Sequence, residues 1–347
     1  VYVSCTCIPG YSIGPWTGNP NVASNQNFVF KITRNPQQNT GTPTTVGLGH
    51  IGVWSNGVSV FNVSDAMSYN NQGIWNRNAY YWEGNGFDNC LGHPQQQGEY
   101  HHHVSPTCLY NDLDSVEHSP IIGYAFDGFP IYGAYAYTNT NGTGAIKRMQ
   151  SSYVMNTATT RSNGPAVGGM YPNGCFIEDY TYSAGAGDLD ERNGRFCVTP
   201  EYPAGTYAYF VTIDQNRVPQ FPYTFFGTYY GVVQPGNTGP GSGHVTITEV
   251  TTVYTGTTGI KNVSDDIKYT LAENPVKDYA YIYFDPQSVN NVKAEIYDIR
   301  GQLLFSQDNM QPSISYTFDF TTYTTGTYFL YLTSANKRIV QKIIKAN

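Results

Sequence analysis

The C-terminal part of the chain alternates polar and apolar residues over short stretches. A period of two places every second side chain on one face, as in a half-buried strand. The turn pairs Asn274-Pro275, Arg300-Gly301 and Thr325-Gly326 separate these stretches. Seven or so short strands with this pattern predict a small immunoglobulin-like β-sandwich. Six of these stretches are 279–284, 292–299, 302–307, 315–320, 326–333 and 337–344.

The longer N-terminal part also favours strands. We predict a short strand at 99–104, a second apolar strand at 119–133 and a half-buried strand at 244–254, where polar and apolar residues alternate. Residues 255–266 are polar and read as a hinge. The predicted organisation is a β domain at 1–256, a linker at 257–266 and the sandwich at 267–347.

Composition supports an all-β protein. Only 12% of the 347 residues are charged, whereas Tyr (31), Gly (36) and Pro (20) are abundant, which favours strands and turns over helical bundles. The net charge of −7 comes without a basic stripe, so nucleic acid is not an expected partner. No apolar run is long enough to predict a transmembrane segment. Since Val1 follows no Met and no signal peptide is visible, we expect that the chain has been processed.

The six cysteines predict disulfides and an oxidising compartment. We favour the neighbouring pairs Cys90–Cys108 and Cys175–Cys197 among the possible pairings. Cys5 and Cys7 then either bridge each other or pair elsewhere. A thiolate metal site is the weaker alternative, because no second CxC or CxxC motif completes it.

Histidines crowd into the segment DNCLGHPQQQGEYHHHVSPTCL at 88–109. On a strand at 99–104, His101 and His103 project from one face, while Tyr100 and His102 face the other way. Two imidazoles on one face form half of a metal site. His93 on the preceding turn and His118 before the next strand are the candidate further ligands.

Imidazole ligands suit Zn, Cu, Ni or Fe, and the absence of thiolate or Met partners favours Cu(II) or Zn. Alternatively, the histidines form hydrogen bonds within a Tyr-rich β surface. His50 and His244 are isolated in the sequence, and we interpret both as structural or exposed. Asp127 either joins the metal site or caps its Asp-Gly turn. Asp88 and Glu99 are candidate acceptors for imidazole N–H groups.

Calcium is a second candidate metal. The run GDLDERNG at 187–194 offers Asp188, Asp190 and Asn193 as oxygen donors, in a pattern like half a calcium loop. Arg192 stands where a further oxygen ligand belongs, so a plain solvated turn is the competing interpretation.

The segments LAENPVKDYAYIYF, AEIYDIRGQLLFS and FDFTTYTTGTYFLYLTSANKRIVQKIIK, from 271 onward, resemble the type A C-terminal sorting domain of proteins exported by the type IX secretion system of Bacteroidota. The resemblance covers the chain from about 268 to the end. It implies passage through the type IX secretion machinery and an extracellular or cell-surface location.

A second resemblance covers most of the first domain, from Trp54 to Gly227. GHPQQQGEYHHHVSP and HSPIIGYAFDGFPIYGAYAY resemble the YHYH domain family, named for a Tyr-His-Tyr-His motif. The motif here is Tyr100-His101-His102-His103, so His102 replaces the second Tyr and both motif histidines remain. The resemblance implies an extracellular β-rich domain with a suspected metal site.

No GxSxG, HExxH, P-loop or GxGxxG signature is present, so catalytic residues stay unassigned. We expect a metal-binding surface protein that is structural and self-associating, as a filament or sheath subunit. Low charge leaves strand edges unguarded, and tyrosines suit interfaces. The alternative is a secreted metal-dependent hydrolase or oxidase that uses the histidine cluster, with water at an open coordination position.

Overall fold

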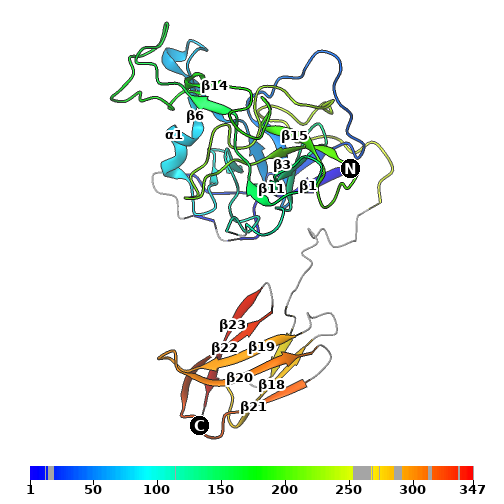
Figure 1. Ribbon diagram of the computed structural model, residues 1–347, viewed down its shortest axis with the longest axis vertical. Helices are drawn as coiled ribbons and strands as arrows, with labels where there is room; N and C mark the ends of the chain where they lie inside the picture. Colours follow the sequence, from blue (N-terminus) through cyan, green and yellow to red (C-terminus); the bar gives the residue numbers. More distant parts are fainter. Residues whose placement is uncertain are drawn as a thin grey trace. The chain divides into compact units, whose positions relative to one another are not determined.

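The computed structural model confirms an all-β protein, which divides into two compact units, Val1–Val253 and Tyr254–Asn347. Each unit is described by itself (Figure 1). The predicted linker at 257–266 lies outside the residues that the structure describes. Those residues are 1–11, 13–14, 19–113, 115–252, 267, 269–272, 274–284, 291–311, 315–334 and 337–346.

The first unit is built from short strands. They are β1 (Tyr2–Cys5), β2 (Phe28–Lys31), β3 (His50–Trp54), β4 (Ser59–Phe61), β5 (Ser64–Ser68), β6 (Asn76–Asn78), β7 (His93–Pro94), β8 (Tyr100–His102), β9 (Ile121–Ala125), β10 (Pro130–Tyr132), β11 (Tyr135–Tyr137), β12 (Ile146–Arg148), β13 (Tyr153–Met155), β14 (Tyr180–Tyr182), β15 (Gly194–Cys197) and β16 (Thr206–Phe210). The helical elements are α1 (Ala79–Glu83) and the 3-10 turns η1 (Tyr69–Asn71), η2 (Gly84–Gly86) and η3 (Ile177–Asp179).

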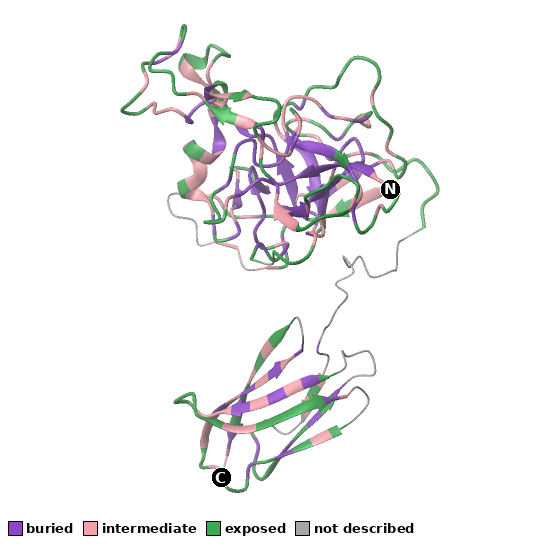
Figure 2. Cartoon of the chain, in the orientation of Figure 1, coloured by how far each residue is buried: buried purple, intermediate pink, exposed green. Residues whose placement is uncertain are grey.

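A mixed sheet of eight strands, in the order β15-β16-β10-β9-β3-β4-β8-β7, forms the centre of this unit. Its strands are almost wholly buried, as Figure 2 shows, and pack around side chains such as Trp54, Tyr100 and Phe126. Every residue of β3 and β16 is buried, because both faces of these strands are covered. Their sequences therefore do not alternate between polar and apolar residues as those of half-buried strands do. Strands β7 and β8 close the end of the sheet where the histidines lie.

Two predicted strands differ from the observed ones. The apolar stretch 119–133 is not one strand but a hairpin of β9 and β10, because Asp127-Gly128 makes a tight turn, with Gly128 at φ +89°. The stretch 244–254 alternates but makes only an isolated bridge between His244 and Val29 within its described part. The alternation of polar and apolar residues in this stretch therefore does not correspond to a strand, because its described residues form no further strand pairing.

The hairpin of β7 and β8 depends on glycine at its turn. Gly98 has φ +81°, a conformation that a side chain disfavours, and its N–H donates to the carbonyl of Gln95 at 2.8 Å. A Cβ at Gly98 would lie 2.2 Å from Ser24 Oγ. The turn therefore requires glycine, and it sets the register that pairs His93 with His101.

One predicted disulfide is confirmed and the other is wrong. Cys90 and Cys108 are bonded, with their Cα atoms 5.2 Å apart. Cys175 and Cys197 are both free and buried. Cys197 packs in a cluster with Tyr132 and Met149, whereas the Cys175 carbonyl accepts from Asn78 N and Trp82 Nε1. The pairing was predicted because the two cysteines are close in sequence, but they are buried in separate parts of the unit.

Cys5 and Cys7 are free as well, so the expectation that they form disulfides is wrong. Cys7 is buried, with its thiol 3.0 Å from the Tyr100 carbonyl, which it donates to. Burial raises the pKa of Cys7 to about 12, and that of Cys5 to about 11. These thiols therefore stay protonated at neutral pH, which disfavours a thiolate metal site.

The second unit is a two-sheet β-sandwich. Its strands are β17 (Tyr269–Ala272), β18 (Tyr279–Phe284), β19 (Val292–Tyr297), β20 (Leu303–Met310), β21 (Ser315–Asp319), β22 (Gly326–Thr333) and β23 (Arg338–Lys345). The sheets have the orders β17-β18-β21 and β20-β19-β22-β23. In β18 and β19 exposed or half-buried side chains alternate with buried ones, as the sequence predicts. The apolar faces of both sheets meet in one core.

Among the described residues, no helix has the length and apolar character that crossing a membrane requires.

Candidate metal centre

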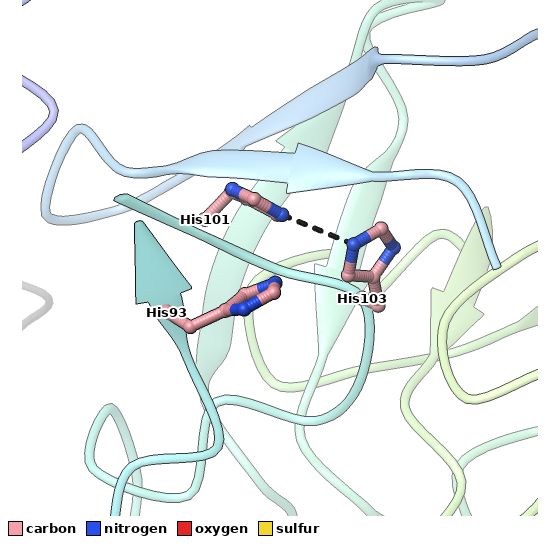
Figure 3. A group of neighbouring side chains, drawn as sticks. All are labelled: His93, His101 and His103. Atoms are coloured by element: carbon pink, nitrogen blue, oxygen red, sulfur yellow. Dashed lines mark hydrogen bonds between the residues drawn. The ribbon is translucent and has the colours of Figure 1, made fainter. Parts of the chain in front are cut away.

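The β7–β8 hairpin gathers three imidazoles (Figure 3). His93 on β7 pairs directly with His101 on β8, so both side chains project from the same face. Strand β8 is shorter than the predicted strand and ends at His102. His103 lies one residue past its end, and its side chain still joins the other two on that face, as the alternation along the segment predicts. All three are buried, and one ligand atom from each lies within 4.8 Å of the others. The structure therefore brings together three of the predicted ligands.

Contacts with the backbone assign the ring nitrogens of two of these histidines. His101 Nδ1 lies 3.1 Å from the Glu99 carbonyl oxygen, and His103 Nδ1 lies 2.5 Å from the Asn62 carbonyl oxygen. A carbonyl only accepts, so each Nδ1 carries a proton, and in a neutral ring each Nε2 is left with a bare lone pair. The two Nε2 atoms are 3.0 Å apart. Two lone pairs this close repel each other unless a proton or a cation lies between them.

Burial keeps protons off His93 and His101. It lowers the pKa of His93 to about 4, and the charge of His103 lowers it further. Burial also lowers the pKa of His101 well below its ordinary value, with His93 and His103 as additional causes. Neutral imidazole is the form that binds metals, so both rings are ready ligands at neutral pH.

Glu83 is a fourth donor that the sequence did not reveal. It is the last residue of α1, which Asn78 caps by accepting from Tyr80 N. Glu83 Oε2 lies 3.1 Å from His103 Nε2 and 3.5 Å from His93 Nε2. Burial opposes its ionisation, but His103, His93 and Arg77 outweigh this effect and lower the pKa of Glu83. The cluster therefore offers three imidazoles and one carboxylate.

The four side chains stand in the wall of an open cleft with a volume of about 930 Å³. His93 Nε2 is buried and has no hydrogen-bond partner in the described part of the chain. Phe61 supports the site from inside the unit, since its ring stacks on His101 at 4.0 Å between centroids. A metal ion held here would have protein on one side and the cleft on the other.

His118 and Asp127 are not part of this site, contrary to the prediction. Strand β9, which follows His118, is three strands away from β8 in the sheet, roughly 14 Å at the usual strand spacing. His118 Nδ1 donates to the Ser119 carbonyl at 2.7 Å. Asp127 is buried and accepts from Tyr209 Oη, Phe129 N and Gly231 N. It therefore caps its turn, which was the alternative interpretation.

Glu99 and Asp88, the two carboxylates beside the histidine segment, contact different groups. The Glu99 carboxylate lies with Oε1 2.5 Å from Nε2 of His50, which is buried and structural, so it pairs with an imidazole outside the cluster and not, as expected, with one of the clustered histidines. Asp88 instead accepts from Tyr100 Oη and from backbone N–H groups, including that of Cys90. His244 is exposed. His102 faces away from the cluster, and its Nε2 lies 3.2 Å from Tyr11 Oη.

The structure does not favour calcium at 187–194. Asp188 is paired with Lys147 at 2.8 Å and accepts from Gln150 N. Asp190 Oδ1 accepts from the N–H groups of Arg192 and Gly194. The Asn193 amide donates to backbone carbonyls and is buried. Asp190 caps the turn, while Asp188 and Asn193 are engaged by residues outside it, so the oxygen donors do not converge on a calcium site.

The fold and the site define an all-β protein in which a β-hairpin presents a buried imidazole cluster to a cleft, followed along the chain by a β-sandwich. The family model described as YHYH protein matches residues 29–223, and the chain belongs to this family. The model described as a secretion system C-terminal sorting domain matches residues 274–346. No curated protein matches the chain.

Both predicted resemblances are thus confirmed. The sorting domain indicates passage through the type IX secretion machinery and export to the extracellular space or the cell surface. The three clustered histidines and Glu83 all lie within the part that matches the YHYH model.

Proposed function

We propose that the protein is an exported metal-binding protein with a metal centre formed by His93, His101, His103 and Glu83. The observation that carries the proposal is the 3.0 Å approach of the His101 and His103 Nε2 atoms, both of which face away from their own hydrogen-bonded Nδ1 groups. A cation between them turns a repulsive contact into a favourable one. The carboxylate of Glu83 adds a compensating negative charge.

The donor set favours zinc or copper. Three imidazoles and one carboxylate, without thiolate or thioether, match the ligands that both ions accept. The two Nδ1–H groups held by carbonyls fix ring orientation, as the outer hydrogen bonds of metal-binding histidines commonly do. Zinc with three protein nitrogens is a frequent arrangement in catalytic sites, where a further position stays open.

The position of the donors in a cleft wall supports a reactive or ligand-binding centre rather than a purely structural one. Structural zinc sites are closed by four protein ligands, whereas here the three imidazoles would hold the metal, with the Glu83 carboxylate beside them as its charge partner, and would leave a position open to a cleft of about 930 Å³. A metal ion bound there would supply Lewis-acid polarisation of a ligand or an activated water. The chain's own residues would orient that ligand, and Glu83 would balance the charge. This favours the metal-dependent enzyme among the two functions considered from the sequence.

The metal content of purified full-length protein tests the proposal. We expect about one zinc or copper ion per chain by elemental analysis, and its loss in the His101→Ala/His103→Ala double variant. His118→Ala is the matched control, because His118 is a partly buried histidine of the same unit outside the cluster. It should keep the metal. Equal metal content in all three proteins would refute the site.

A further inference from the structure

We infer that the cleft beside the metal centre binds a neutral, hydroxyl-rich ligand, an oligosaccharide, and this inference rests on the proposed function. Side-chain amides are the most frequent polar groups in the cleft lining, and the lining contains neither Lys nor Arg among the described residues. The amides that the argument uses are Asn19, Asn21, Asn85, Gln95, Gln96 and Gln97. A side-chain amide carries a donor and an acceptor next to each other, which matches adjacent sugar hydroxyl groups.

Three of these amides are free to meet a ligand. Asn85, Gln96 and Gln97 are exposed, and their side chains make no hydrogen bond with any other described residue. The others are occupied: Gln95 Nε2 donates to Glu99 Oε2 at 2.8 Å, and Asn19 and Asn21 donate to the Pro94 carbonyl. Gln96 and Gln97 lie in the turn that joins β7 and β8, so they belong to the same hairpin as the imidazoles and line the same cleft.

The charges of the lining are compensated within the protein. Asp65 is paired with Arg77 at 2.7 Å, and Glu99 with His50. Glu83 faces the imidazole cluster and, in the proposed centre, the metal ion. With no Lys or Arg in the described lining, an anionic group could be compensated only at the metal itself, and anywhere else along the cleft its desolvation would be costly. The lining therefore suits a neutral ligand.

The same cleft is poorly suited to a peptide bound by strand addition. Strand β7 is the end of the sheet and borders the cleft, so its edge is the place where a peptide strand would pair. Pro94 has no N–H to donate, and its carbonyl oxygen accepts from the Asn19 and Asn21 amides at 3.1 and 3.2 Å. The edge is thereby blocked, and side-chain amides are left as the recognition groups.

Trp82 adds an apolar surface to the cleft. Its indole N–H donates to the Cys175 carbonyl at 2.8 Å, and Arg77 lies over the ring at 4.2 Å, so ring carbons that Arg77 leaves uncovered are what the side chain can offer the cleft. Sugar rings have apolar C–H faces beside their hydroxyl groups, and pockets combine such apolar walls with a few placed polar groups.

A glycan array of neutral and anionic oligosaccharides, probed with zinc-loaded full-length protein, tests the inference. We expect binding to neutral glycans, and titration calorimetry with the best hexasaccharide should give a dissociation constant that rises at least tenfold in Gln96→Ala/Gln97→Ala. The matched control is Gln37→Ala/Gln38→Ala, two adjacent exposed glutamines outside the cleft. It should bind like the unmodified protein.

Metal content is measured on the same samples, so that the two proposals can fail separately. Normal metal content with no binding to neutral glycans overturns the inference and leaves the metal centre standing. Preferential binding of anionic glycans, or of a tryptic peptide mixture used as a comparison, also overturns it, as does unchanged affinity of Gln96→Ala/Gln97→Ala. Neutral glycan binding by a protein without metal supports the ligand class and refutes the metal centre.

Discussion

Replacing Cys90 and Cys108 together by alanine removes the cross-link that closes the histidine loop. The bonded residues are 18 positions apart, and His93, His101 and His103 all lie between them. Cross-linking a loop of this length restricts the unfolded chain and stabilises the fold by about 3 kcal/mol in the chain-entropy model. For a unit of this size that corresponds to a melting temperature lower by about 6–12 °C.

Differential scanning calorimetry of the metal-free full-length protein measures this effect with an internal control. All six cysteines lie at or before position 197, so the C-terminal unit contains no cysteine. We expect the transition of the first unit to move and that of the second unit to stay in place. A shift below about 2 °C, or an equal shift of both transitions, would contradict the reasoning.

Three further predictions follow from particular residues. Glu83→Gln keeps the shape of the side chain but removes its charge, so the zinc dissociation constant, measured by chelator competition, should rise about 10–100-fold, and an unchanged value would exclude Glu83 from the site. Burial lowers the pKa of His118 below its ordinary 6.5, so the neutral ring is favoured in the fold and stability falls as the pH drops below 6.5. In urea titrations of metal-free protein, His118→Asn should lose less stability than the unmodified protein between pH 7 and pH 5, by at most about 1.4 kcal/mol per pH unit, and parallel curves would refute this. Self-association in which the C-terminal unit takes part stays a prediction from composition. Light scattering of the full chain and of a chain ending at Thr258 tests it. If both proteins are monomeric at high concentration, the prediction is wrong.

Local patterns were enough to predict the imidazole pair and its hairpin. His101 and His103 share a face because the strand period is two, and that rule needs no knowledge of the rest of the fold. The same holds for Cys90–Cys108, which flank the hairpin. In the second unit, strands such as β18 alternate as the sequence does, because one face of each sheet is buried against the other sheet.

Long-range packing decided what the sequence could not reveal. Glu83 reaches His103 only because α1 packs beside the hairpin, and a glutamate twenty positions before a histidine carries no recognisable signal. His118 was expected at the site because it is close in sequence, but sheet order separates its strand from β8. Cys175 and Cys197 likewise required knowledge of which core buries each thiol.

X-ray absorption spectroscopy of the metal-loaded full-length protein tests the central claim most directly, because it reports the atoms bound to the metal. The account predicts nitrogen and oxygen ligands at about 2.0–2.2 Å, with the outer-shell scattering of three imidazole rings. In His101→Ala/His103→Ala this signal should disappear. Sulfur ligands at about 2.3 Å would place the metal on the free thiols instead, and contradict the proposed centre.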